Sequence, residues 1–158
     1  MALTSVQKGN VIESQIATLL MLISDGELAP YRPLVDDDGI DLIVGARGGL
    51  ETVFMQIKSR FITNARYKNR LDFSVKQNTL SSSRRMLVLC VYYDQLDGRI
   101  DTMWLIPASV VIQNAISVKS GFRIVASRNV TSADKWSQFK VTPTQLVNAL
   151  QTRLGSGL

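Results

Sequence analysis

Three polar side chains interrupt otherwise apolar segments of this chain, namely Asp41, Gln56 and Lys58. A carboxylate and an amide oxygen are ligands that a hard cation such as Mg²⁺ accepts at about 2.1 Å, while waters and a substrate phosphate complete its shell. A nearby ammonium can orient or deprotonate an attacking water, or it can neutralise charge that develops on phosphorus. The three residue types therefore indicate metal-assisted phosphate chemistry, with both roles of Lys58 left open.

A β-hairpin over residues 36–60 would bring these side chains together. Residues 40–44 and 52–57 are rich in apolar and β-branched side chains, and the glycines between them can reverse the chain. Counting back equally from a turn near Gly48 and Gly49 places Asp41 opposite Gln56. Because side chains alternate along a strand, Gln56 and Lys58 share one face. The sequence thus predicts that Asp41, Gln56 and Lys58 converge.

These motifs resemble those of the PD-(D/E)XK nuclease superfamily, in which an acidic residue on one strand is followed by acidic-x-Lys on the next. The segments Gly39-Ile40-Asp41-Leu42 and Gln56-Ile57-Lys58-Ser59 are similar to the branch in which Gln replaces the second acid, found among restriction enzymes, homing endonucleases and resolvase-like proteins. Two departures are the Ile in place of the motif's Pro before Asp41 and the neutral Gln56.

The resemblance implies a restriction-endonuclease-like fold of the α/β class, with a mixed β-sheet flanked by helices. It also extends to Glu13, at the position where the first helix of these nucleases carries a metal-orienting acid. The implied catalytic set is Glu13, Asp41, Gln56 and Lys58, with Mg²⁺ or Mn²⁺ held by Asp41, Gln56 and Glu13. The alternatives are structural: an ion pair of Asp41 with Lys58, a cross-strand hydrogen bond of Gln56, and a Glu13 that complements the helix dipole.

The positive charge of the chain is concentrated downstream of the hairpin. Residues 58–85 contain eight basic residues and one acid, whereas the rest of the chain has ten basic and twelve acidic residues. Such a segment can neutralise nucleic-acid phosphates, and a solvated face is the alternative. The residues expected to contact nucleic acid are Lys8, Ser59, Arg60, Arg66, Lys68, Arg70, Lys76, Gln77, Arg84 and Arg85.

The remaining pattern alternates helices and strands. Apolar spacing predicts helices over residues 4–24, 107–114 and 143–154, an irregular edge strand over 28–35, and strands over 86–93, 101–106 and 121–126. The continuous apolar run around Cys90 predicts a buried central strand, and Phe73 is expected in the core. Trp104 and Trp136 are expected in the core or at a subunit contact. Asp36, Asp37 and Asp38 are expected in a solvated turn.

Composition narrows the classes of function. With 158 residues, 46% of them hydrophobic, the chain is expected to form a single domain over residues 1–154 with a flexible tail at 155–158. The absence of histidine excludes histidine bases, and one cysteine allows no internal disulfide. No apolar run has the length of a membrane span, so no membrane partner and a cytoplasmic location are expected.

The leading hypothesis is a Mg²⁺-dependent DNA endonuclease that forms a homodimer or larger homo-oligomer, because cutting two strands usually requires two sites. A second hypothesis is a catalytically inactive nuclease fold that binds DNA through the basic segment. A third is an assembly or regulatory protein that binds an acidic protein partner through the same segment.

Overall fold

The computed structural model describes residues 2–35, 39–62 and 69–155, and the expected succession of helices and strands is present in it. The helices are α1 (Ser5–Ile23), α2 (Ala108–Asn114) and α3 (Pro143–Gly155). The strands are β1 (Leu28–Tyr31), β2 (Leu42–Ala46), β3 (Thr52–Ile62), β4 (Arg70–Lys76), β5 (Met86–Asp94), β6 (Arg99–Pro107), β7 (Ile116–Val118), β8 (Gly121–Ser127) and β9 (Lys140–Val141). Two short 3₁₀ turns, η1 (Gln77–Thr79) and η2 (Ser137–Phe139), complete the described elements.

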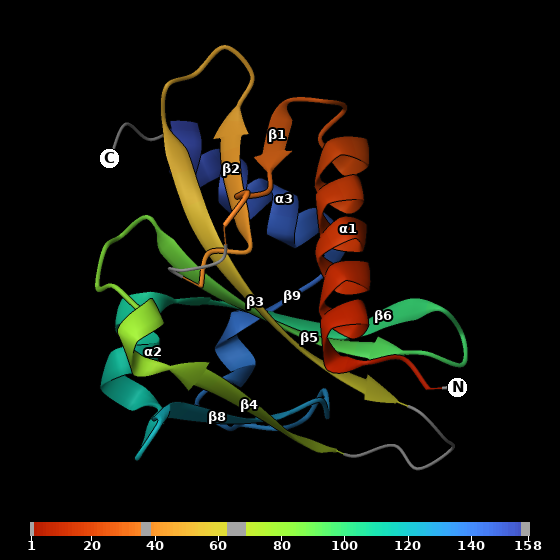
Figure 1. Cartoon of the computed structure of the whole chain (residues 1–158), viewed down its shortest axis with the longest axis vertical. Coiled ribbons are helices and arrows are strands. Elements are labelled where there is room, and N and C mark those ends of the chain that lie inside the picture. The colour runs from red at the N-terminus through yellow and green to blue at the C-terminus, as the bar shows by residue number, and fades with distance from the viewer. Residues whose placement is uncertain (1, 36–38, 63–68, 156–158) are drawn as a thin grey trace.

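A six-stranded mixed sheet in the order β1-β2-β3-β5-β6-β9 forms the centre of the fold (Figure 1). β3 and β5 are parallel, whereas the other neighbouring pairs are antiparallel. The expected edge strand is confirmed, since β1 lies at one edge of this sheet. The fold is therefore the predicted α/β arrangement of a mixed sheet flanked by helices.

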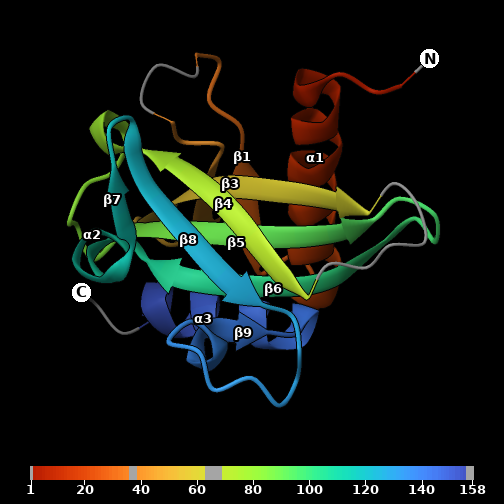
Figure 2. The ribbon, with the colours of Figure 1, turned by 90° about the horizontal axis from the view of Figure 1, so that it is seen from below.

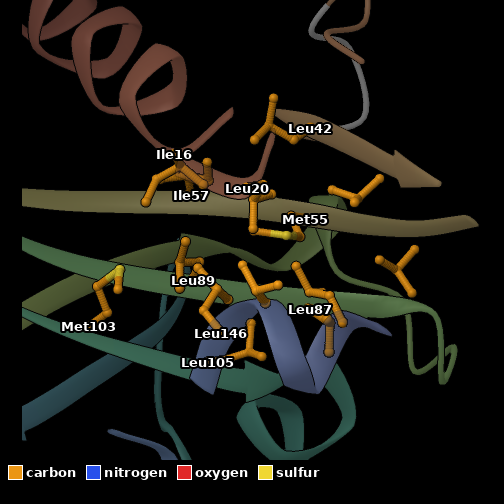
Figure 3. Packing of buried hydrophobic residues seen from close by; sticks show 14 of the residues in the cluster. Ile16, Leu20, Leu42, Met55, Ile57, Leu87, Leu89, Met103, Leu105 and Leu146 are labelled. Carbon is orange, nitrogen blue, oxygen red and sulfur yellow. The ribbon is translucent and has the colours of Figure 1, made fainter. Parts of the chain in front are cut away.

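A second sheet of three strands, in the order β4-β8-β7, crosses one face of the large sheet (Figure 2). The sequence did not predict this separate sheet, because β7 has only three residues and because β4 pairs with the distant β8. α1 and α3 cover the opposite face, and their apolar side chains pack onto β3, β5 and β6 (Figure 3). The large sheet is thus buried on both faces.

Double burial explains why every residue of β5 is buried. Leu87, Leu89 and Val91 contribute to the core beneath the two helices, whereas Val88 and Cys90 contribute to the core beneath the small sheet. The predicted core positions of Cys90, Phe73, Trp104 and Trp136 are confirmed, since each is at most 1% exposed. Burial also raises the pKa of the Cys90 thiol far above its usual range, against smaller opposing effects of Lys58 and Arg60.

α1 begins where the sequence expects it to begin. Thr4 is the N-cap, and it exchanges hydrogen bonds with Gln7 in a capping box. Ile12, Ile16 and Leu20 follow at intervals of four residues and are fully buried, so one stripe of the helix faces the core. None of the helices in the described ranges combines the length and apolarity needed to cross a membrane.

The β2–β3 hairpin positions the candidate site. Its turn includes Gly48 at a φ of +73°, a backbone conformation that favours glycine, and Gly49 N donates to Ala46 O at 3.0 Å. β2 pairs with β3 only from Thr52 to Met55, whereas β3 pairs with β5 as far as Ile62. The second half of β3 therefore extends beyond its partner in β2.

At the C-terminus, the predicted tail begins one residue too early, because Gly155 is still part of α3. Residues 156–158 lie outside the described residues, as do Asp36, Asp37 and Asp38, so the turn expected there is not tested.

Candidate active site

Asp41 lies directly before β2, at the point where β2 and β3 separate. The register Leu42↔Met55, together with a 2.9 Å hydrogen bond from Asp41 N to Met55 O, places Asp41 opposite Gln56, as the hairpin argument predicts. Asp41 Oδ2 also accepts a hydrogen bond of 2.5 Å from Ile57 N. Since Ile57 lies between Gln56 and Lys58, this bond ties the carboxylate to the Gln-x-Lys segment.

Gln56 is 1% exposed, and a local hydrogen-bond network fixes the orientation of its amide. Thr79 Oγ1 donates to Lys76 O at 2.9 Å, so the same hydroxyl accepts from Gln56 Nε2, which lies 3.0 Å away. This leaves Gln56 Oε1 as a buried acceptor without a hydrogen-bond partner among the described residues. An unsatisfied buried polar atom costs about 1–3 kcal/mol, so a ligand bound to this oxygen would recover part of that free energy.

Gly39 allows the chain to pass close to this amide. Its φ of +66° favours glycine, and a Cβ at this position would lie 2.6 Å from Gln56 Nε2 and from Thr79 Cβ. Any larger residue would push the amide or Thr79 out of place. The glycine two residues before Asp41 thus helps to hold the Gln56 amide in its observed orientation.

Glu13 and Asp41 line one pocket of about 410 Å³, here called the carboxylate pocket. Its lining residues are Asn10, Glu13, Arg32, Pro33, Leu34, Ile40 and Asp41. The structure therefore brings Glu13 from α1 to the same hollow as Asp41. It also places Arg32 there, in an ion pair with Glu13, and sequence reasoning missed this arginine because its segment showed only an irregular strand.

Gln56 and Lys58 do not line the carboxylate pocket. Both start from the face of β3 that carries the small sheet, since they pair with Val88 and Cys90 of the core on that side. Within the described ranges, no hydrogen bond or ion pair joins the Lys58 ammonium to another residue, so the structural pair of Asp41 with Lys58 is not formed. Asp41 connects the two regions, because it lines the pocket and accepts a hydrogen bond from Ile57 N, between Gln56 and Lys58.

The chemistry of these groups suits a hard cation. The two carboxylates and the unpartnered amide are oxygen donors, which Mg²⁺ and Mn²⁺ accept together with several waters. Across the part of the chain that the structure describes, no cluster of three or more His, Cys, Asp or Glu side chains is placed to hold a metal ion. The oxygen donors that the described residues offer near such a cation include Asp41 and Glu13, which line the pocket, and Gln56, which lies outside its lining.

A second hollow, here called the basic pocket, lies beside the first turn of α1 and has a volume of about 280 Å³. Its lining residues are Ser5, Lys8, Ser59, Arg60 and Phe61. Lys8 Nζ lies 5.3 Å from the centre of the Phe61 ring, and Arg60 Nε donates to Asp72 O at 2.6 Å. Three of the residues expected to contact nucleic acid, Lys8, Ser59 and Arg60, are thus brought together.

The other residues of the basic segment are dispersed. Arg70 and Lys76 are exposed on the outer side of β4, and Gln77 is exposed in a one-turn 3₁₀ helix. Arg84 is exposed, whereas Arg85 forms an ion pair with Glu51. Arg66 and Lys68 lie outside the described residues. The segment therefore does not form one continuous basic face in the described part of the chain.

Arg123 is a further cation near the basic segment, and no sequence pattern singles it out. It lies on β8 opposite Ser74 of β4 and forms an ion pair with Asp72. The hydrogen bond from Arg123 lowers the pKa of the Asp72 carboxyl, which partial burial alone would raise. Only the pairing of distant strands reveals this contact.

The sequence matches no protein-family model. It also matches no curated protein sequence. Among solved structures, the fold is similar to that of a bacterial homing endonuclease, I-Ssp6803I, with a TM-score of 0.58 over 98% of this chain and 99% of that chain. The two sequences are 15% identical, so this likeness concerns the fold.

Proposed function

We propose that this protein is a metal-dependent DNA endonuclease that hydrolyses phosphodiester bonds. The observation that carries the proposal is the buried Oε1 of Gln56, which has no hydrogen-bond partner in the described part of the chain although its amide is fixed by Thr79. Its neighbourhood supplies the other parts of a phosphodiesterase site, with Asp41 opposite it and Lys58 two residues along the same strand face. The whole-chain likeness to the fold of a homing endonuclease supports the same reaction class.

In this proposal, Asp41, Gln56 and Glu13 hold Mg²⁺ or Mn²⁺ at the edge of β3. A bound cation would polarise the scissile phosphate and stabilise its developing charge. Asp41 is held in place by Ile57 N, which removes the need to order the carboxylate when the substrate arrives. Lys58 provides an ammonium without a protein partner in the described ranges, which either contacts the attacking water or neutralises charge on phosphorus.

The basic pocket would hold a phosphate neighbouring the scissile one. Lys8 and Arg60 supply two positive charges and Ser59 a hydroxyl, beside the strand that carries Lys58. Arg70, Lys76 and Arg84 are exposed and would add contacts farther along the DNA, together with Arg66 and Lys68 of the same basic segment. Such contacts give affinity that falls with salt and carry little sequence information.

The test is a cleavage assay on plasmid and branched DNA with Mg²⁺ or Mn²⁺, in which the native chain cuts and the Asp41→Ala and Lys58→Ala variants do not. The matched controls are Asp97→Ala and Lys119→Ala, which change the same residue types on the β5–β6 and β7–β8 turns. An inactive native chain, or variants as active as the native chain, would contradict the proposal.

A catalytically inactive DNA-binding module is the second candidate function. It is favoured by the ion pair of Arg32 with Glu13 and by the absence of Gln56 and Lys58 from the lining of the carboxylate pocket. It predicts salt-dependent DNA binding without cleavage in any divalent metal, with Asp41→Ala binding as the native chain does.

We also propose that the protein acts as a homodimer or larger homo-oligomer, because one site cuts one strand. An apolar hollow of about 560 Å³, lined in part by Leu19, Leu22, Ile23, Ile100 and Pro143, supports self-association. Leu22 is 75% exposed there. Sedimentation of the native chain and of Leu22→Asp tests this: the native chain should sediment as an oligomer and the variant as a smaller species, whereas a monomeric native chain contradicts it.

A further inference from the structure

The Arg32–Glu13 pair presents a conflict with the metal site proposed above. Arg32 donates from Nη2 to Glu13 Oε2 and also, at 3.1 Å, to Asn10 Oδ1, so its guanidinium lies on α1 in front of one expected metal ligand. The described lining residues of the pocket include two carboxylates, Glu13 and Asp41, and one guanidinium, Arg32. A divalent cation among these carboxylates would repel the guanidinium strongly at such short range.

Stability does not explain the pair. The Arg32 side chain is 44% exposed and that of Glu13 is 19% exposed. Ion pairs with this much solvent contact contribute little to folding free energy, because water screens the attraction and the long arginine side chain loses freedom. The pair therefore contributes little to holding α1 in place, and Arg32 can leave Glu13 at a small cost in folding free energy.

The backbone around Arg32 is restrained, while its side chain has room to move. Pro30 lies within β1, paired with Val44, and Pro33 follows Arg32 directly and lines the same pocket. Both prolines fix φ near −65°, so a change of partner would involve the side chain rather than the chain path. A guanidinium released from Glu13 would stay at the mouth of the pocket, and its planar fork is suited to two oxygens of a phosphate.

We infer that Arg32 is a phosphate-binding residue of this site, which pairs with Glu13 in the free protein and transfers to a DNA phosphate when the divalent cation takes Glu13. This inference rests on the proposed function, since it needs the cation and the DNA. Arg32 thereby weakens metal binding by the DNA-free protein and favours metal binding in the complex. Metal and DNA then bind cooperatively. The metal displaces Arg32 from Glu13 and so frees it for a DNA phosphate, and the DNA phosphate holds Arg32 away from Glu13 and so favours the metal.

The first experiment is calorimetric titration of Mn²⁺ into the DNA-free native chain and into Arg32→Ala. Loss of one positive charge beside the ligands should tighten Mn²⁺ binding by about tenfold. Arg99→Ala is the matched control, because Arg99 is also an exposed arginine paired with an acid, Asp97, but at the start of β6. Its Mn²⁺ affinity should equal that of the native chain. In the Glu13→Gln background, Arg32→Ala should no longer tighten Mn²⁺ binding by this amount.

The second experiment is the salt dependence of DNA binding in Ca²⁺, a cation chosen to occupy the site while cleavage is monitored separately. Removal of one phosphate contact should lower the slope of log K against log salt by about one for Arg32→Ala. A purely structural arginine would instead lower the melting temperature and leave both the Mn²⁺ affinity and the slope unchanged, which would overturn the inference.

The two proposals fail in different ways. If the native chain binds Mn²⁺ in an Asp41-dependent manner and Arg32→Ala binds it equally or more weakly, the role of Arg32 is wrong and the metal site stands. If neither the native chain nor Arg32→Ala binds Mn²⁺, the metal site and the role of Arg32 are both wrong.

Discussion

The carboxylate pocket and the basic pocket lie beside the same helix but present opposite charges. Glu13 lines the carboxylate pocket and Lys8 lines the basic pocket. The two residues are five positions apart on α1, which separates them by about 7 Å along the helix axis. One pocket has two carboxylates that would attract a cation, and the other has two cations that would attract a phosphate. Under the proposed function, the contrast corresponds to two roles, with hydrolysis at the first pocket and DNA binding at the second.

The two pockets also differ in how their charged groups are held. Asp41 is fixed by a backbone N–H of β3, whereas Arg60 is fixed by a backbone carbonyl of β4. Backbone groups cannot move away without breaking a strand, so both charges are set before a ligand arrives. Lys8 contacts only the Phe61 ring among the described interactions and keeps its ammonium for solvent or phosphate.

The largest effect should follow from Asp41→Ala, which removes a proposed metal ligand that lines the pocket and accepts a hydrogen bond from the Gln-x-Lys segment. Cleavage should fall by about 10²-fold or more, in line with the loss of an electrostatic group at a reacting centre. DNA affinity at fixed salt should stay within about twofold of the native value, because the basic pocket is intact. A parallel loss of DNA affinity would show that hydrolysis and DNA binding are not assigned to separate pockets.

A smaller effect should follow from Gln56→Met, which removes the unpartnered oxygen at similar side-chain volume. Without metal, the melting temperature should change little, because two effects offset each other. Removing the unsatisfied acceptor stabilises the fold, and losing the hydrogen bond to Thr79 destabilises it. In Mn²⁺ at about 100 times its dissociation constant, the native chain should gain about 2.7 kcal/mol of stability, and the variant should gain clearly less. Calorimetric melts with and without Mn²⁺ measure the stability of each protein in both states. An equal gain in stability from Mn²⁺ in the two proteins would exclude Gln56 as a ligand.

A still smaller effect, on DNA affinity and not on cleavage, should follow from Lys8→Ala and from Arg60→Ala. Each change should lower the slope of log K against log salt by about one, while cleavage at saturating DNA stays near the native rate. Lys119→Ala, on the β7–β8 turn, should leave the slope unchanged. A lower cleavage rate at saturating DNA would place Lys8 or Arg60 in the chemical step instead.

The smallest effect concerns Asp72, whose carbonyl holds Arg60 and whose carboxylate pairs with Arg123. Because the hydrogen bond from Arg123 lowers the pKa of Asp72, the ionised carboxyl stabilises the folded state at pH values above its unfolded pKa of about 3.9. This contribution is lost as the pH falls through the lower folded pKa. Asp72→Asn should therefore melt slightly below the native chain at pH 7, and the difference should vanish at strongly acidic pH. A difference that persists in acid would exclude ionic pairing as its origin.

The hairpin could be predicted because its determinants are local. Alternating side chains, a glycine turn and equal strand arms fix the register, and the observed pairing of Leu42 with Met55 agrees with it. The helix α1 was predictable for the same reason, from the Thr4 cap and the spacing of Ile12, Ile16 and Leu20.

The dispersal of the basic segment could not be predicted, because it depends on pairing between distant strands. β4 turns away from β3 and pairs with β8, which moves Arg70 and Lys76 onto a different sheet from Arg60. The Arg32–Glu13 pair is equally non-local, since 19 residues separate its members and neither carries a periodic signal. Likewise, only the position of Thr79 reveals that the Gln56 amide has one free oxygen.

The central claim is that Asp41, Gln56 and Glu13 share one cation at the edge of β3. Anomalous diffraction from crystals of the native chain grown with Mn²⁺ tests it directly. We predict one strong peak about 2.1 Å from an oxygen of Asp41 and from Gln56 Oε1, with Glu13 released from Arg32. A peak elsewhere, or Gln56 Oε1 bonded to a protein donor while Arg32 still pairs with Glu13, would contradict the account.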